Sequence, residues 1–138
     1  MISNPKLIDH IKFGSELKNL VLVESLINKV LQGKNISEDI YGNILIGVTE
    51  AVNNAIIHGN LRNKEFDVEV LVNQSPNSLL FTIIDQGKGF NFHDLPDPTS
   101  PENIEKENGR GIFLIKSLAD KMIIDEPGNV IHIFFNYD

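Results

Sequence analysis

The amino-acid sequence predicts an α/β protein in which a largely antiparallel sheet is layered against helices. Helical and strand-like segments come in mixed order, and two pairs of strands are each joined by a turn, as in hairpins. Segment 37–57 repeats apolar residues at helical intervals, whereas 66–72 alternates apolar and charged residues as a half-buried strand does. The 138 residues are enough for one domain with a hydrophobic core and too few for two.

The composition is ordinary for a soluble globular protein, with 41% apolar and 22% charged residues. The net charge of −7 argues against bulk attraction to nucleic acid or to an anionic membrane, so local backbone dipoles would have to hold an anionic ligand. The absence of cysteine excludes disulfides and cysteine-based metal sites. Neither a signal-peptide pattern nor a membrane-length apolar run is present, so we expect a cytoplasmic protein.

The first half of the chain predicts an edge strand at 7–13, followed by two helices. Ser15 is the expected N-cap of the first helix. Ser37 is expected to begin the second helix, which should run to about Ile57 and end at His58-Gly59. Apolar residues at helical intervals form the buried flank of this second helix: Ile40, Ile44, Leu45, Val48, Ala51, Val52 and Ala55.

The second half of the chain predicts two hairpins, separated by a long loop and a helix. The strands of the first hairpin are 66–72 and 79–85, and those of the second are 122–125 and 130–135. Segment 87–108 is rich in Gly, Pro, Asp and Asn, which makes a regular element improbable. A loop of this length inside a compact domain is usually either disordered or a functional lid.

The first group of candidate functional residues is Glu50, Asn54 and His58, which are spaced four apart and therefore share one helix face. An amide oxygen is a hard ligand for a divalent cation, and a carboxylate one turn away can polarise a hydroxyl group. The alternative is an ordinary solvated face. His58 beside a terminal glycine is expected to serve the helix C-terminus, not to act as a catalyst.

The second group is Asp85-Gln86-Gly87-Lys88-Gly89-Phe90, at the end of a predicted strand. Asp85 shares the parity of the apolar residues before it, so its carboxylate should emerge on the buried face and need a partner. A ligand with an exocyclic amine would be one such partner, because a carboxylate only accepts hydrogen bonds. Gly87 and Gly89 lack a Cβ and would let a flat ring approach. The alternative is a simple glycine turn, with Asp85 paired inside the protein.

The third group is Gly109-Arg110-Gly111, which is expected to open an apolar helix. Free N–H groups at a helix start favour a phosphate, and Arg110 could add a charge-assisted hydrogen bond. The alternative is a flexible lead into a core helix. No Gly-Lys-Ser/Thr follows, so this is not a P-loop.

Taken together, these motifs resemble the nucleotide-binding fold shared by gyrase-type topoisomerases, a class of heat-shock chaperones, histidine kinases and MutL. Within that superfamily the chain looks most like the bacterial anti-sigma-factor serine kinases, the RsbW and SpoIIAB group. Three segments match that group's N box and its two glycine boxes: Glu50-x-x-x-Asn54-Ala55-x-x-His58-Gly59, Asp85-x-Gly87-x-Gly89-Phe90 and Gly109-Arg110-Gly111-Ile112. The resemblance implies one histidine-kinase-like ATPase domain over 1–138, a two-layer α/β (α+β) sandwich with helices on one face of a mixed, mostly antiparallel sheet of the Bergerat type.

The resemblance also implies roles for individual residues. Asn54 would coordinate Mg²⁺ that bridges the phosphates of ATP, and Asp85 would accept the adenine amino hydrogen. Glu50 would be the general base that takes the proton from a partner's serine. The remaining positions would surround the nucleotide: Gly87 and Gly89 at the base, Gly109, Arg110 and Gly111 at the phosphates, and Asn91 to Asn108 as the lid.

The function implied by the resemblance is an ATP-dependent protein serine kinase. It would phosphorylate an anti-sigma-factor antagonist and sequester a sigma factor, and a homodimer is expected only by analogy. No helical segment with a phosphoacceptor histidine precedes the domain, so we do not expect autophosphorylation. Two alternatives remain open: a non-catalytic ATP-sensing module and an interaction domain that binds no nucleotide.

Overall fold

The computed structural model describes residues 4–88 and 107–137. Its strands form one sheet in the order β1-β2-β3-β5-β4, and every neighbouring pair is antiparallel. The strands are β1 (Lys6–Gly14), β2 (Asp67–Ser75), β3 (Ser78–Ile84), β4 (Lys121–Asp125) and β5 (Val130–Asn136). β3 and β4 run in the same direction, but β5 lies between them. The expected mixed sheet is therefore antiparallel in all its adjacent pairs within the described residues.

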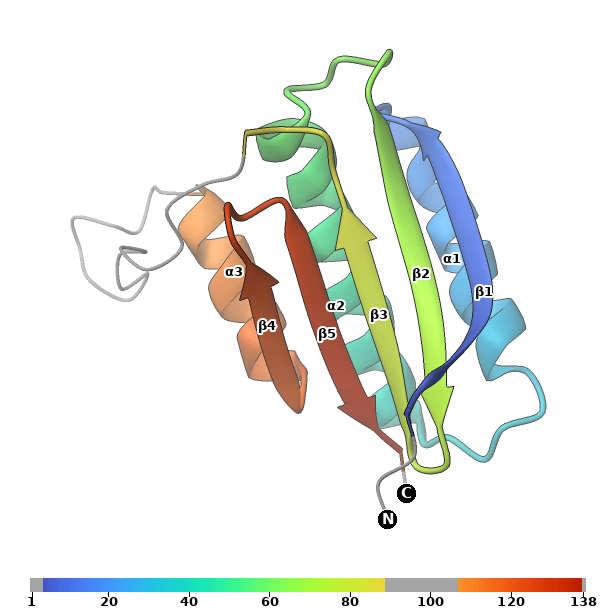
Figure 1. The fold of residues 1–138 in the computed structure, drawn as a ribbon. Coiled ribbons are helices and arrows are strands. Elements are labelled where there is room, and N and C mark those ends of the chain that lie inside the picture. The colour runs from blue at the N-terminus through green and yellow to red at the C-terminus, as the bar shows by residue number, and fades with distance from the viewer. Residues whose placement is uncertain (1–3, 89–106, 138) are drawn as a thin grey trace.

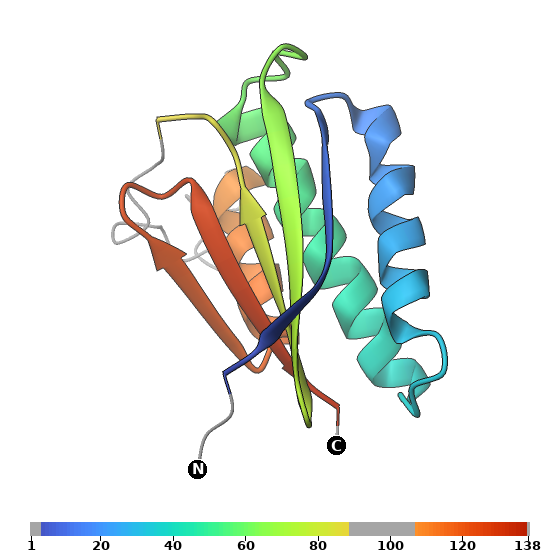
Figure 2. The same cartoon turned by 45° about the vertical axis from the view of Figure 1, so that its right-hand side comes forward.

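The helices α1 (Leu20–Leu31), α2 (Glu38–Asn54) and α3 (Glu107–Leu118) all lie on the same face of the sheet (Figure 1 and Figure 2). Two short segments accompany them, the 3₁₀ turn η1 (Leu17–Asn19) and the π-helical turn η2 (Ala55–Gly59). This arrangement confirms the predicted two-layer sandwich. The core lies between the two layers, because the apolar stripes of the helices face the inward positions of the strands.

The inward positions of the strands follow the alternation expected for a sheet covered on one side. The inward-facing apolar residues of β2, β3 and β5 are buried against the helices: Val68, Val70, Val72, Leu79, Phe81, Ile83, Ile131, Ile133 and Phe135. The opposing residues on the helices are Val23, Leu26, Ile27, Ile44, Val48, Ala51 and Val52. Asp85 directly follows β3 on the inward parity, which brings a carboxylate to the end of this core.

The two helix starts predicted from serine residues have different outcomes. Ser37 caps α2 as expected, because its Oγ accepts a hydrogen bond from the Ile40 N–H at 3.2 Å. The prediction for Ser15 was wrong, since α1 begins only after Asn19 and η1. The Ser15 hydroxyl instead donates to the Phe66 carbonyl oxygen at 2.7 Å. The Ser15 hydroxyl, which could have capped a helix, is therefore used in a tertiary hydrogen bond instead.

The end of the second helix also differs from the expectation in its geometry. The α-helical part stops at Asn54, and the chain continues through the wider turn η2 to Gly59. The Asn60 N–H donates to the Ala55 carbonyl oxygen, five residues back, at 2.8 Å. The predicted end at Gly59 is thus correct in position, but its last turn is π-helical.

The segment before α3 is only partly described. α3 begins at Glu107, so Gly109 and Gly111 lie within its first five residues and do not open it as expected. Gly89 and most of the predicted lid, 91–106, lie outside the described residues. Among the helices that the structure does describe, none combines the length and apolar character needed to cross a membrane.

Candidate functional site

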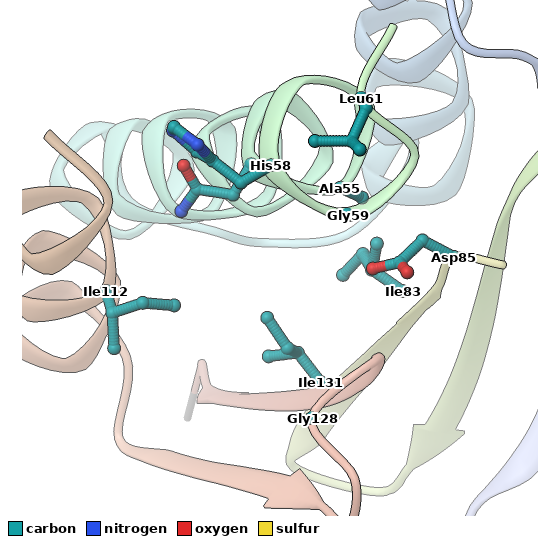
Figure 3. A pocket seen from close by; sticks show the side chains of 10 residues that line it. Ala55, His58, Gly59, Leu61, Ile83, Asp85, Ile112, Gly128 and Ile131 are labelled. Carbon is teal, nitrogen blue, oxygen red and sulfur yellow. The ribbon is translucent and has the colours of Figure 1, made fainter. Parts of the chain in front are cut away.

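A cavity of about 220 Å³ lies where the end of α2, α3 and the last hairpin meet the end of β3. Figure 3 shows its walls: the helix end with His58 and Leu61, Ile112 of α3, Ile131 of β5, and Ile83 with Asp85. The full lining is Asn54, Ala55, His58, Gly59, Leu61, Ile83, Asp85, Ile112, Gly128 and Ile131. Most of these side chains are apolar, so the few polar groups decide what can bind.

Asp85 supplies the carboxylate at one end of the cavity. Its Oδ1 accepts a hydrogen bond from the Gly87 N–H at 2.8 Å, while Oδ2 accepts none from the described residues. Its main chain is fixed by Asn129: the Asp85 N–H donates to the Asn129 carbonyl oxygen, and the Asp85 carbonyl oxygen accepts from Asn129 Nδ2. Burial raises the pKa of the Asp85 carboxyl group above its ordinary value, and the bond from Gly87 offsets part of that rise.

Two glycines allow the close packing around Asp85. A Cβ on Gly59 would lie 2.4 Å from the Asp85 carboxyl carbon, and a Cβ on Gly87 would lie 2.2 Å from the Gly59 carbonyl oxygen. Both distances are far shorter than any real Cβ contact. The glycines therefore let the helix end and the turn after β3 meet around one carboxylate.

Glu50 and Asn54 lie one turn apart on α2, and Gly111 of α3 packs against both. A Cβ on Gly111 would lie 2.7 Å from Glu50 Oε1 and 2.8 Å from Asn54 Nδ2. Asn54 is only 8% exposed, and its Nδ2 has no hydrogen-bond partner among the described residues. A buried polar atom without a partner is costly, which is the pattern expected where a ligand supplies the missing bond.

The π-helical turn η2 shapes the wall that faces Asp85. Leu61 and Arg62, which follow this turn, have φ angles of 53° and 59°, in the left-handed region that side chains rarely adopt. Leu61 lines the cavity although it is 78% exposed. Wide helical turns and such backbone angles are uncommon and concentrate at functional sites. Here they bring Gly59 against Asp85 and turn the chain away immediately afterwards.

Five predicted site residues come together at this cavity or directly against it: Glu50, Asn54, Asp85, Gly87 and Gly111. Gly109 and Arg110 lie in the first turn of α3, where the structure describes the main chain alone. Gly89 lies outside the described residues. No cluster of three His, Asp or Glu side chains suited to a metal ion exists in the described ranges.

The apolar walls of the cavity and the groups that hold the turn Asp85-Gln86-Gly87 are not predictable from local sequence. Ile112 belongs to a helix, and Gly128 and Ile131 to the last hairpin, but no local pattern shows that these elements reach the same cavity. Asn60 and Asn129 carried only the general signal that asparagine favours turns and helix ends. Their partners are 26 and 44 residues away in the chain, so their roles depend on the tertiary structure.

The polar groups and the apolar walls suit a ligand with two chemically different ends. The Asp85 carboxylate and the isoleucine walls can take a planar heterocycle that bears an amino group. At the other end, the buried Nδ2 of Asn54 has no partner among the described residues and can donate a hydrogen bond to an anionic group.

Comparison with known proteins identifies the family of this chain. Residues 13–135 match the model of the histidine kinase-like ATPase domain family. Serine-protein kinase RsbW of Staphylococcus epidermidis is 28% identical over 123 residues, which cover 84% of this chain and 77% of that protein. The anti-sigma F factor of Bacillus licheniformis is 34% identical over 93 residues, covering 62% of each chain.

A solved structure of RsbU and RsbW domains from Mycobacterium tuberculosis shares the fold. It superposes with a TM-score of 0.67 at 14% sequence identity over 98% of this chain, which spans 32% of that longer chain. The family match over residues 13–135 includes the segments that carry Glu50, Asp85 and Gly111. The chain thus belongs to the histidine kinase-like ATPase family, as a member similar to RsbW and the anti-sigma F factor.

Proposed function

We propose that this protein is an ATP-dependent protein serine kinase that phosphorylates an anti-sigma-factor antagonist and sequesters a sigma factor. The single observation that carries the proposal is the meeting of Asn54, Asp85 and Gly111, from three separate motifs, at one cavity. Membership of a histidine kinase-like ATPase family supports the use of ATP. The names of the relatives, serine-protein kinase RsbW and anti-sigma F factor, support the reaction and the two partner classes.

The Asp85 end of the cavity fits the adenine base. Its Oδ2 has no partner among the described residues and can accept a hydrogen bond from the adenine amino group. Ile83, Ile112 and Ile131 offer apolar surface to the faces of a flat ring. Gly87 keeps the turn beside Asp85 free of a side chain, and we assign Gly89 to the same part of the site from its place in the motif.

The Asn54 end fits the phosphates and a magnesium ion. The buried carboxamide of Asn54 has an atom without a partner, and turning this amide over would present its oxygen, a ligand type that Mg²⁺ accepts. A Cβ at Gly111 would lie 2.8 Å from this amide, so glycine lets α3 pack directly against Asn54. Gly109 and Arg110 are assigned to phosphate contacts with Gly111. When bound, Mg²⁺ would neutralise negative charge on the phosphates.

Glu50 is the proposed general base. Its carboxylate lies against Gly111, one helical turn before Asn54, and has no hydrogen-bond or ion-pair partner among the described residues. In the transfer, the serine hydroxyl oxygen of the antagonist bonds to the γ-phosphorus of ATP, and the bond from that phosphorus to the β–γ bridging oxygen breaks. ADP leaves, and Glu50 takes the proton of the serine.

The test compares Glu50→Gln with Glu24→Gln, a matched change at an exposed glutamate on the outer side of α1. Each protein is incubated with Mg-ATP and a panel of small antagonist proteins from the same genome, and phosphoserine is measured by mass spectrometry. Glu50→Gln should lower the transfer rate by about 10²-fold or more while ATP still binds. Glu24→Gln should leave both quantities unchanged.

Two results would contradict the proposal. Wild-type protein that binds Mg-ATP but phosphorylates no antagonist would favour the ATP-sensing module. Transfer by Glu50→Gln at the wild-type rate would remove the assignment of the general base.

A further inference from the structure

A buried asparagine outside the three motifs connects the two sides of the Asp85 end of the cavity. Asn60 is the first residue after the π-helical turn and is only 1% exposed. Its Oδ1 accepts a hydrogen bond from the Gln86 N–H at 2.8 Å. Its Nδ2 donates to Ser15 Oγ at 2.8 Å and to the Asp67 carbonyl oxygen at 2.9 Å. Both hydrogens of this buried carboxamide are thus donated to protein acceptors, and its oxygen accepts a bond from a main-chain N–H.

Gln86 is the residue between Asp85 and Gly87, so the bond that its N–H donates to Asn60 holds the centre of the turn. The Gln86 side chain is itself engaged, because its Oε1 accepts from the Asp67 N–H. Asn129 fixes the main chain of Asp85 from the opposite side. The turn is therefore held by Asn60 from the helix and by Asn129 from the last hairpin.

We propose that Asn60 is a positioning residue for base recognition: by holding Gln86, it sets the place of the Asp85 carboxylate and so the affinity and selectivity for adenine. This inference rests on the proposed function. Asn60 does not line the cavity, and it acts on the ligand only through Asp85.

The packing around Asp85 explains why a small shift of the turn should matter. A Cβ on Gly59 would lie 2.4 Å from the carboxyl carbon of Asp85, so the carboxylate sits tightly under the helix end. Without the Asn60 oxygen, the Gln86 N–H loses its buried acceptor and the turn must move to find another. Any such movement carries the Asp85 carboxylate with it and misaligns its bond to the base.

The test compares Asn60→Ala with the matched control Ser15→Ala. Ser15→Ala removes the hydrogen bond that Asn60 Nδ2 donates to Ser15 and the bond that Ser15 donates to the Phe66 carbonyl oxygen. It leaves the bond between Gln86 and Asn60 intact. Both variants should lower the melting temperature. Only Asn60→Ala should also change recognition of the base, which a purely structural role would not do.

Two measurements are made on each protein. The first is amide hydrogen exchange of Gln86 without nucleotide, which should be slow in wild type and Ser15→Ala and fast in Asn60→Ala. The second is calorimetric binding of ATP and of GTP with Mg²⁺. Asn60→Ala should lose about tenfold in ATP affinity, the effect of about one hydrogen bond, and its preference for ATP over GTP should shrink. Ser15→Ala should bind both nucleotides as wild type does.

Asn60→Asp separates the bond to Gln86 from stability, because its buried charge should lower the melting temperature while an acceptor oxygen remains. It keeps an oxygen for the Gln86 N–H and loses both donated bonds, so Gln86 should stay protected and ATP should bind within about threefold of wild type. Across the variants, ATP affinity should correlate with slow amide hydrogen exchange of Gln86 and not with the melting temperature. If wild type binds ATP and affinity follows melting temperature instead, the inference is wrong and the proposed function stands. If folded wild type binds no ATP, both are overturned.

Discussion

The two ends of the cavity are built in opposite ways. At the Asp85 end, the turn is held by Asn60 and Asn129, and glycines at 59 and 87 let the segments pack without a gap. At the other end, the Asn54 amide has a buried atom without a partner, and Glu50 has none among the described residues. The main chain beside Asp85 is thus held by hydrogen bonds where we place the base, whereas polar side-chain atoms of Asn54 and Glu50 lack partners among the described residues where we place the phosphates and the metal. This contrast predicts that a bulkier residue in the packed turn at the Asp85 end will destabilise the fold, whereas removal of the Asn54 amide will not.

The largest effect is expected from Gly87→Ala at the Asp85 end. The new Cβ would collide with the Gly59 carbonyl oxygen, a main-chain atom that cannot turn away. We expect a loss of about 1–3 kcal/mol in the free energy of unfolding, measured by urea denaturation, together with a loss of ATP binding. Gly42→Ala on α2 is the control, because nothing lies within 4 Å of its Cβ. It should instead stabilise the helix by about 0.5–1 kcal/mol. Equal stability of the two variants would contradict the tight packing described for this end.

The next effect is expected from Asp85→Asn. The amide keeps one acceptor oxygen but loses the charge, so ATP affinity measured by calorimetry should fall by about 10- to 100-fold. Unlike Gly87→Ala, this variant should unfold at neutral pH no more easily than wild type, because it removes a carboxylate that burial destabilises. ATP affinity equal to that of wild type would show that Asp85 does not recognise the base.

The pH dependence of stability gives an independent check on Asp85. Burial raises the pKa of this carboxyl group in the folded protein above its ordinary value of 3.8. Between 3.8 and the raised pKa, the folded state binds more protons at Asp85 than the unfolded state does. The stability that the protonated Asp85 contributes is therefore fully present below pH 3.8 and is lost as pH rises through the folded pKa. The difference in melting temperature between Asp85→Asn and nucleotide-free wild type should therefore grow with pH across that window. A constant difference would argue against a raised pKa.

The smallest effect is expected from Asn54→Leu at the opposite end. Leucine has the same branching as asparagine and removes a buried amide atom that lacks a partner among the described residues, so the nucleotide-free protein should gain up to about 1 kcal/mol in stability. The same change should abolish the Mg²⁺ dependence of ATP binding, measured by calorimetry with and without the ion. A variant less stable than wild type would mean that the amide already has a partner in the folded protein, and the contrast between the two ends would fail.

Much of the fold follows from local patterns in the sequence. The alternation in β2 and the apolar intervals of α2 fixed which faces are buried, since both depend only on the period of the element. The position of Asp85 on the inward parity of β3 followed for the same reason. The prediction for Ser15 failed because its hydroxyl found a partner at Phe66, 51 residues away, and no local rule describes that competition.

The candidate site was predictable as a set of residues and not as an arrangement. The spacing of Glu50 and Asn54 and the glycines around Asp85 have chemical meaning within a few residues of sequence. The approach of Gly111 to Glu50 depends instead on how α3 packs against α2. Likewise, the π-helical turn that brings Gly59 against Asp85 has no marker in its sequence, Ala55-Ile56-Ile57-His58-Gly59.

The two asparagines that hold the Asp85 turn come from segments on either side of it in the chain, one before β2 and one before β5. The carboxylate reaches its final place only when the last hairpin has joined the sheet, because Asn129 belongs to that hairpin. Under the proposed function, a nascent or shortened chain that has all three motifs but lacks the final hairpin would not bind adenine tightly. Tight binding of ATP would then indicate that β4 and β5 have joined the sheet. The nucleotide would stabilise this completed fold by mass action.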